Sequence, residues 1–198
     1  MSLKFSYSLI APFYDAAIAR ATASIRQKNL QNLPQEGNFS ILINGIGTGL
    51  DIPYLPQTHH YTGLDLTSAM LKRASARAGK LQIDLVQGNS LALPFANESF
   101  DHAVLHLILA VVPDPLACLS ETARVLKPGG SVLLLDKFLR PNQKAWVRRA
   151  LTPLSGQIAT RMDVVFEKVL AKVPQFMVVS DEPVLAGGWF RAIRLIKT

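Results

Sequence analysis

The sequence predicts an α/β fold in which helices cover both faces of a doubly wound, mostly parallel sheet. Short runs rich in Leu, Ile and Val alternate with stretches typical of amphipathic helices, and Gly or Pro falls between them. The chain has 198 residues, of which 49% are hydrophobic and 18% charged. This length and composition predict a single domain over 1–198 with a full core.

The chain is expected to open with a helix over about 5–33 that ends before Pro34. Apolar residues at helical spacing predict a buried face that includes Ala21 and Ile25, with Arg26 elsewhere. Such a helix serves either as a core helix or as a lid.

The remaining elements follow in alternation. The strands of the parallel part are expected at 40–44, 61–65, 83–87, 102–107 and 131–136. Helices are expected at 68–78, at 115–126 and, with a break near Pro153, over about 142–172. The chain is expected to close with a hairpin of strands 176–181 and 189–196, joined by a turn at 182–188.

A glycine turn follows the first expected strand, with Gly45, Gly47 and Gly49 in the segment GIGTG. Such a turn lets the backbone approach a phosphate or an adenosine at the carboxyl end of a parallel strand. The dinucleotide fingerprint requires a glycine where this chain has Leu50, which disfavours NAD. Asp65 ends the second strand and can accept hydrogen bonds from ribose hydroxyls, but this feature is common to both cofactor classes. A purely structural turn is the alternative for the glycines alone.

Four segments carry a family resemblance: ILINGIGTGL, YTGLDLTSAMLKRA, VQGNSLALPFANESFDHAV and ETARVLKPGGSVLLLD. In order and spacing they resemble the motifs of class I S-adenosylmethionine-dependent methyltransferases, over about residues 5–136. The subgroup it resembles contains the ubiquinone and menaquinone C-methyltransferases and the phosphatidylethanolamine N-methyltransferases. The segments YSLIAPFYD and LILAVVPDP and the basic C-terminal region are most similar to the phospholipid enzymes. The resemblance implies a Rossmann-like seven-stranded sheet with an antiparallel C-terminal hairpin strand, and S-adenosylmethionine as cofactor.

The resemblance also implies which residues hold the cofactor. They are Asn44, Gly45, Gly47, Gly49, Asp65, Leu66, Met70, Asn89, Ser90, Leu91 and His106. The glycines would lie under the methionine part and Asp65 would hold the ribose, while Leu66 and Met70 would flank the adenine. Asn89 stands where the family usually has Asp, and its side-chain carbonyl can still accept a hydrogen bond from the adenine amino group.

Ile43 departs from the family pattern, because a carboxylate usually stands two residues before the first glycine. That carboxylate helps to orient the amino acid end of the cofactor, and here Asn44 or a water would substitute. Three outcomes are open: an enzyme with altered contacts, weakened cofactor affinity, or a non-catalytic protein that binds the cofactor or a partner protein.

Methyl transfer requires alignment of acceptor and methyl group and exclusion of water, without a metal or a covalent nucleophile. An amine acceptor must also lose a proton, and Tyr7, Tyr14 and His106 are the candidate catalytic residues. The two tyrosine rings could instead stabilise cations through cation-π contacts. The alternatives are packing roles for the tyrosines and a buried, hydrogen-bonded strand position for His106.

The other reactive side chains are expected to be structural. The histidines have no metal-ligand spacing, and His59 and His60 are expected to be exposed in a loop. Cys118 is the one cysteine, and we expect a buried thiol.

The net charge of +7 arises entirely within 137–198, where eleven Lys or Arg face four Asp or Glu. This asymmetry indicates an anionic membrane surface, a nucleic acid or an acidic substrate as partner, or else a solvated basic face. Nucleic acid is disfavoured, because aromatic residues are not interleaved with the basic ones. Trp146, Arg148 and Arg149 favour peripheral binding to anionic lipid.

No signal peptide is recognised, and the apolar stretch 103–112 is shorter than the roughly 20 residues of a spanning helix. We therefore expect a cytoplasmic methyltransferase, either free or associated with the membrane surface, that acts on the amine of the phosphatidylethanolamine head group. The alternative acceptor is a quinone precursor or another small molecule, and a non-catalytic protein is the further alternative.

Overall fold

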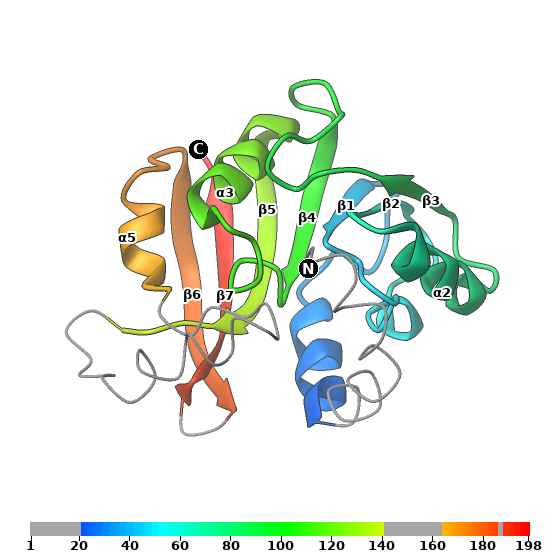
Figure 1. The fold of residues 1–198 in the computed structure, drawn as a ribbon, viewed down its shortest axis with the longest axis horizontal. Coiled ribbons are helices and arrows are strands. Elements are labelled where there is room, and N and C mark those ends of the chain that lie inside the picture. The colour runs from blue at the N-terminus through cyan, green and yellow to red at the C-terminus, as the bar shows by residue number, and fades with distance from the viewer. Residues whose placement is uncertain (1–20, 141–163, 186–187) are drawn as a thin grey trace, which may run out of the picture.

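The computed structural model describes residues 21–140, 164–185 and 188–198 (Figure 1). These residues form a seven-stranded sheet with the order β3-β2-β1-β4-β5-β7-β6. The strands are β1 (Ser40–Asn44), β2 (His60–Asp65), β3 (Ile83–Gln87), β4 (Phe100–His106), β5 (Leu126–Lys137), β6 (Phe176–Leu185) and β7 (Phe190–Lys197). Strands β1 to β5 are mutually parallel, so the predicted doubly wound α/β fold is confirmed.

Helices cover both faces of this sheet (Figure 1). They are a helical segment at 21–30, η1 (Ile52–Tyr54), α2 (Ser68–Ala78), α3 (Pro115–Val125) and α5 (Phe166–Leu170). Helix α3 shows why the local sequence is helical: the Asp114 carboxylate accepts from the Ala117 amide at 3.0 Å, and Pro115 occupies the first turn.

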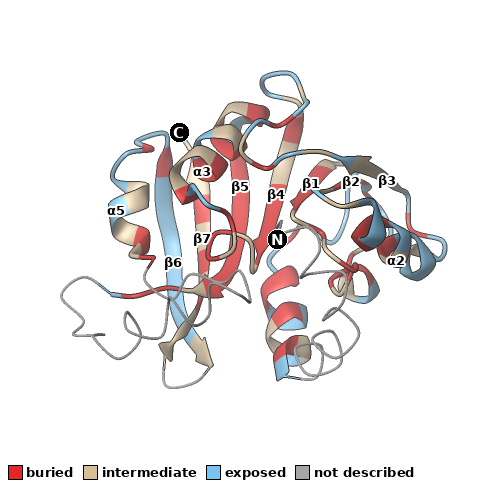
Figure 2. Ribbon diagram, in the orientation of Figure 1, coloured by how far each residue is buried: buried red, intermediate tan, exposed pale blue. Residues whose placement is uncertain are grey.

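The central strands are buried along most of their length (Figure 2), and alternate residues of β1 enter two different cores. Leu42 of β1 packs in the core under α3, together with Leu119. Ile41 and Ile43 pack in the core on the opposite face, together with Leu30 of segment 21–30. The central strands are therefore buried on both faces, which explains their near-continuous apolar sequences.

The two C-terminal strands are antiparallel to each other, and β7 is antiparallel to β5, as the predicted closing hairpin requires. The turn expected at 182–188 was wrong in its first part, since β6 continues to Leu185 and Glu182 pairs with Ala192. Pro183 is tolerated inside β6 because this strand lies at the sheet edge.

Within the described residues the other predicted helices and strands are present, and most of their bounds lie within a residue or two of the expected ones. Strands β4 and β5 begin earlier than expected, at Phe100 and Leu126. Of the N-terminal lid helix only 21–33 lies within the described residues, where 21–30 is helical. The expected helical region 142–172 lies largely outside them, although α5 falls at its end.

The buried face of segment 21–30 is not the predicted one. Ala21 is exposed and Ile25 half-buried, whereas Thr22, Arg26 and Asn29 are buried beside Leu30. These polar residues are buried because they find polar partners: Arg26 contacts Thr22 and Asp51, and Asn29 contacts His106 and the Leu134 carbonyl on the sheet.

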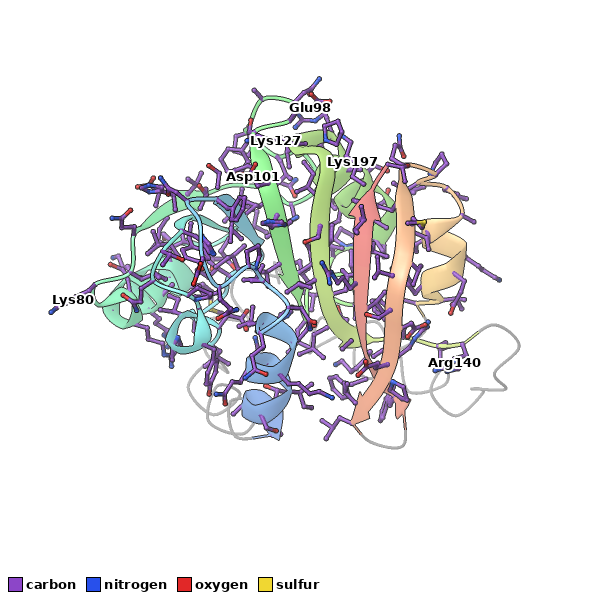
Figure 3. The ribbon with its side chains drawn as sticks, turned by 180° about the vertical axis from the view of Figure 1, so that it is seen from behind. Lys80, Glu98, Asp101, Lys127, Arg140 and Lys197 are labelled. Atoms are coloured by element: carbon purple, nitrogen blue, oxygen red, sulfur yellow. The ribbon has the colours of Figure 1, made fainter. Side chains whose placement is uncertain are left out.

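Two ion pairs lie at the end of the sheet opposite the glycine turn, where β4 and β5 begin (Figure 3). Lys127 at the start of β5 contacts Asp101 of β4 at 2.7 Å, and Lys197 at the end of β7 contacts Glu98 at 3.8 Å. No helix among the described residues is both long and apolar enough to cross a bilayer.

Candidate cofactor and methyl-transfer site

The glycine turn follows β1 at the carboxyl edge of the parallel strands. The amides of Gly45 and Ile46 both donate to the Leu64 carbonyl at 2.9 Å, which holds the start of the turn against β2. Gly47 has a φ of +56°, and no heavy atom lies within 4 Å of the position that a Cβ would take. Open space beside a left-handed glycine fits the backbone cradle that a nucleoside cofactor requires.

Asp65 lies at the end of β2, directly beside this turn. Its Oδ2 accepts from the Gly47 amide at 3.1 Å, and its Oδ1 accepts from the Thr67 amide at 2.9 Å. Burial raises the pKa of this carboxyl, and the hydrogen bonds from Thr67 and Gly47 partly offset the rise. Thr67 Oγ1 also donates to Oδ1 at 3.2 Å, so the carboxylate is oriented and Oδ2 keeps a lone pair that can accept from a ribose hydroxyl.

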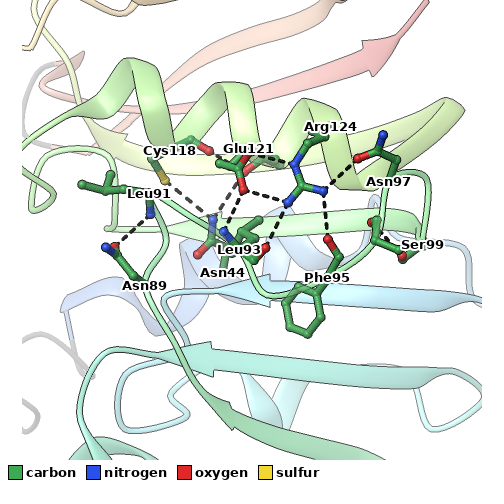
Figure 4. Close-up of polar contacts among 12 residues, drawn as sticks. Asn44, Asn89, Leu91, Leu93, Phe95, Asn97, Ser99, Cys118, Glu121 and Arg124 are labelled. Carbon is green, nitrogen blue, oxygen red and sulfur yellow. Dashed lines mark hydrogen bonds and ion pairs between the residues drawn. The ribbon is translucent and has the colours of Figure 1, made fainter.

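The residues expected to enclose the adenine come from two segments. Leu66 is 46% exposed at the end of β2, while Met70 of α2 and Ser90 are each 8% exposed. Asn89 Oδ1 accepts from the Leu91 amide at 3.0 Å, so one lone pair of the expected adenine acceptor is already used (Figure 4). The side chain is thereby fixed, which leaves its amide nitrogen as a second polar group for a base.

The loop that carries Asn89 is held against α3 by hydrogen bonds to Arg124 and Glu121, which form an ion pair within that helix (Figure 4). Arg124 donates to both carboxylate oxygens of Glu121 at 2.8 Å and to the carbonyls of Leu93 and Phe95 at 3.0 and 2.8 Å. Glu121 in turn accepts from the Leu93 amide at 2.7 Å. The planar guanidinium thus joins several points of one loop, which a lysine could not do.

The Asn44 side chain lies on the α3 face of the sheet. It is fully buried, and its amide nitrogen donates to Thr122 Oγ1 at 3.3 Å and to Cys118 Sγ at 3.6 Å. The side chain therefore joins β1 to α3 and does not replace a carboxylate at Ile43. The Cys118 thiol is buried as expected, and burial raises its pKa to about 12.

His106 lies at the end of β4 with both ring nitrogens occupied by protein groups. Nδ1 lies 2.8 Å from Asp51 Oδ1, and Nε2 lies 3.0 Å from the amide nitrogen of Asn29. Because the Asn29 amide donates to Nε2, Nε2 is the acceptor and Nδ1 carries the hydrogen. Nδ1 therefore donates a hydrogen bond to Asp51. A substrate can therefore reach Nε2 only if Asn29 yields.

Asp51 connects this histidine to the N-terminal helix. Its Oδ1 also accepts from Arg26 Nη1 at 2.8 Å, and Arg26 Nε donates to Thr22 at 2.9 Å. Burial alone would raise the pKa of Asp51, but the electrostatic interactions and hydrogen bonds with His106 and Arg26 outweigh burial and hold the pKa well below its ordinary value.

Sequence reasoning missed Arg26, Asn29 and Asp51 as members of the site. Ile43 is 1% exposed in the core on this same face, and Asp51 is a buried carboxylate that contacts His106. No local sequence pattern indicates these contacts, because Arg26 and Asp51 are 25 positions apart and Asn29 and His106 are 77 positions apart.

The remaining predicted residues lie elsewhere. Tyr7 and Tyr14 lie outside the described residues. His59 was expected to be exposed, which is wrong: it is fully buried, and its Nε2 donates to the Pro34 carbonyl at 2.7 Å. His60 is exposed at the start of β2.

The seven-stranded sheet with an antiparallel C-terminal hairpin, the glycine turn after β1 and the carboxylate at the end of β2 agree with the fold that the resemblance to class I S-adenosylmethionine-dependent methyltransferases implies. Residues 42–134 match the family model described as a methyltransferase domain. The chain is 31% identical over 186 residues to the phosphatidylethanolamine N-methyltransferase of Cereibacter sphaeroides, covering 91% of each chain. The chain therefore belongs to this family, and S-adenosylmethionine is its cofactor.

Other similar proteins differ in what they share with this chain. The ubiquinone/menaquinone biosynthesis C-methyltransferase of Roseobacter denitrificans is 43% identical over 94 residues, which cover 44% of this chain and 38% of that protein. A solved S-adenosylmethionine-dependent methyltransferase from Thermotoga maritima has a TM-score of 0.74 at 19% identity and covers 99% of this chain and 100% of that chain. The cyclase SpnF has a TM-score of 0.78 at 16% identity, covering 98% and 94%. The last two likenesses show the fold alone.

Proposed function

We propose that this methyltransferase N-methylates the head group of phosphatidylethanolamine. The observation that carries the proposal is the extent of the sequence match. The phosphatidylethanolamine relative aligns along 91% of the chain, including the C-terminal third, whereas the quinone-type relative aligns along 44%. Cofactor binding is common to both groups, so the acceptor is better inferred from the relative that also matches the remainder.

The geometry supports a reaction in which the protein aligns and shields the reactants. When bound, S-adenosylmethionine supplies a methyl group activated by its sulfonium. The Gly47 cradle and Asp65 hold the cofactor at the ends of β1 and β2, and the clamped loop at Asn89 closes the adenine side. Segment 21–30 covers the ends of β4 and β5, where it excludes water from the transfer site.

The proton of the acceptor amine leaves at this same edge. His106 is the proposed base. Asp51 holds the hydrogen of His106 on Nδ1, and the Asn29 amide occupies Nε2 until the acceptor displaces that amide. Tyr7 and Tyr14 are proposed to surround the amine from the segment that precedes 21–30.

A direct competition experiment tests the proposed acceptor. Purified protein and methyl-labelled cofactor are incubated with equal amounts of phosphatidylethanolamine and demethylmenaquinone in the same detergent micelles. The proposal predicts label in the phospholipid, and label only in the quinone would contradict it. A quinone precursor is the alternative acceptor. Its support is the 43% identity to the quinone-type relative over 94 residues, against 31% to the phosphatidylethanolamine relative over 186 residues.

A further inference from the structure

The end of β5 carries a half-buried lysine at the edge where the cofactor turn lies. Lys137 is the last residue of β5, and His106 is the last residue of the neighbouring parallel strand β4. His106 pairs with Leu135 of β5. Lys137 follows Leu135 by two residues, so it lies on the same face of the sheet as His106. Leu133, further back on this face, packs in the core that includes Leu30 of the covering helix.

The ammonium of Lys137 has no ion-pair partner within residues 21–140, 164–185 and 188–198. Among the residues that the structure describes, its Nζ makes no hydrogen bond or ion pair and lies 5.9 Å from the centre of the Phe190 ring. The adjacent Asp136 carboxylate is directed to the opposite face, where its oxygens accept from the amides of Ala110 at 2.9 Å and Lys137 at 2.7 Å. Burial lowers the pKa of Lys137, and Asp136 only partly offsets this.

Two other buried cations of the described chain have carboxylate partners, whereas the half-buried Arg73 and Arg194 have none among the described residues. Arg26 pairs with Asp51, and Arg191 pairs with Glu167 at 2.8 Å and with Asp181. A partly desolvated cation without such a partner is unfavourable unless a ligand supplies the anion. What distinguishes Lys137 is its position, because it is a half-buried cation at the end of β5, beside the end of β4.

We propose that Lys137 binds the phosphodiester of the methyl acceptor; this inference rests on the proposed function. Neighbouring strands lie about 4.8 Å apart. Only two carbon atoms separate the amine of phosphatidylethanolamine from its phosphate, a span of similar length. An amine held for methylation over the end of β4 therefore places its phosphate over the end of β5, within reach of the lysine ammonium.

The test compares Lys137→Met, which keeps the aliphatic stem, with Lys137→Arg, which keeps the charge. Lys80→Met is the matched control, because Lys80 is exposed in the turn after α2 and far from β5 (Figure 3). KM and kcat are measured for phosphatidylethanolamine in neutral detergent micelles and for the cofactor. We expect Lys137→Met to raise the KM for the lipid about tenfold, the loss of one charged hydrogen bond, with the KM for the cofactor unchanged. Lys137→Arg should retain most of the affinity.

An unchanged lipid KM in Lys137→Met would overturn the inference, as would a rise confined to the cofactor KM, which would assign the lysine to the cofactor carboxylate. Calorimetric titration with glycerophosphoethanolamine separates this inference from the proposed function. If wild type methylates no phosphatidylethanolamine yet binds this compound more tightly than Lys137→Met does, the anion site stands and the proposed reaction fails. If wild type and Lys137→Met bind it equally, the site itself is excluded.

Discussion

Four buried polar side chains meet on one face of the sheet: Arg26, Asn29, Asp51 and His106. They come from the N-terminal helix, the segment after the glycine turn and the end of β4. An ion pair in such a position is costly to form and more costly to break, because removing one partner leaves a desolvated charge. The network therefore fixes the helix to the cofactor edge of the sheet.

Asp51→Asn tests this network. The substitution leaves Arg26 and its buried charge without a carboxylate, and we expect the free energy of unfolding at pH 7 to fall by about 3–5 kcal/mol. Urea unfolding measures the effect. Asp101→Asn, at a partly exposed ion pair with Lys127, serves as control and should cost at most about 1 kcal/mol.

The pH dependence of stability gives a second test of the same residue. Because the folded pKa of Asp51 lies below its ordinary value of about 3.9, its contribution is complete above that pH and is lost as the pH falls toward the folded pKa. The difference in stability between wild type and Asp51→Asn should therefore shrink below about pH 4. A constant difference down to pH 2.5 would contradict the assignment.

Asp65 is the residue on which cofactor affinity depends most directly. A charged carboxylate that accepts from ribose hydroxyls contributes about 1.5–3 kcal/mol, so Asp65→Ala should weaken cofactor binding about 10- to 100-fold. Calorimetry measures the dissociation constant, with Asp84→Ala as a control on the exposed part of β3. Equal affinities of wild type and Asp65→Ala would remove Asp65 from the site.

At the scale of elements, the loop between β3 and β4 depends on α3 for its position. Arg124 and Glu121 hold its backbone at Leu93 and Phe95 (Figure 4). The loop also carries Asn89, so the clamp couples the packing of α3 to the expected adenine side of the cofactor site.

Arg124→Ala should therefore raise the KM for the cofactor severalfold while the KM for the lipid stays unchanged. Arg124→Lys should not restore the cofactor KM, because an ammonium cannot bond these acceptors together in one plane. Steady-state kinetics with each substrate varied in turn measures both constants. Full rescue by lysine would show that only charge at this position matters.

The sequence predicted the elements better than their mutual contacts. β1, α2 and β3 fall at their expected bounds, because apolar runs and the flanking Gly and Pro residues are local features. The buried face of segment 21–30 was predicted wrongly, since Arg26 is buried only through a partner 25 positions away. The inward turn of Asn44 toward α3 likewise depends on Thr122, 78 positions away.

At the scale of the molecule, charge is divided unevenly. The first 136 residues carry no net charge and the remainder carries +7. A basic surface near anionic lipid gains about 1 kcal/mol per Lys or Arg, which would bring the enzyme to a bilayer that contains its proposed acceptor.

Replacing Arg148 and Arg149 by Glu should therefore reduce flotation with vesicles of phosphatidylethanolamine and phosphatidylglycerol. Turnover of a micellar substrate should change little. Flotation of wild type should also weaken as salt rises from 0.05 to about 0.5 M, because screening shortens the range of the attraction. Undiminished flotation of the double variant would place the membrane contact elsewhere.

Methyl transfer to the amine of a phospholipid head group is the reaction that we propose for this enzyme. The most direct measurement incubates purified protein with methyl-labelled S-adenosylmethionine and a total bacterial lipid extract, and separates the organic phase by thin-layer chromatography. We predict label in mono-, di- or trimethylated phosphatidylethanolamine, and about 10- to 100-fold less for Asp65→Ala at a cofactor concentration below the dissociation constant of wild type. Label in a quinone, or no label in any phospholipid, would contradict the claim.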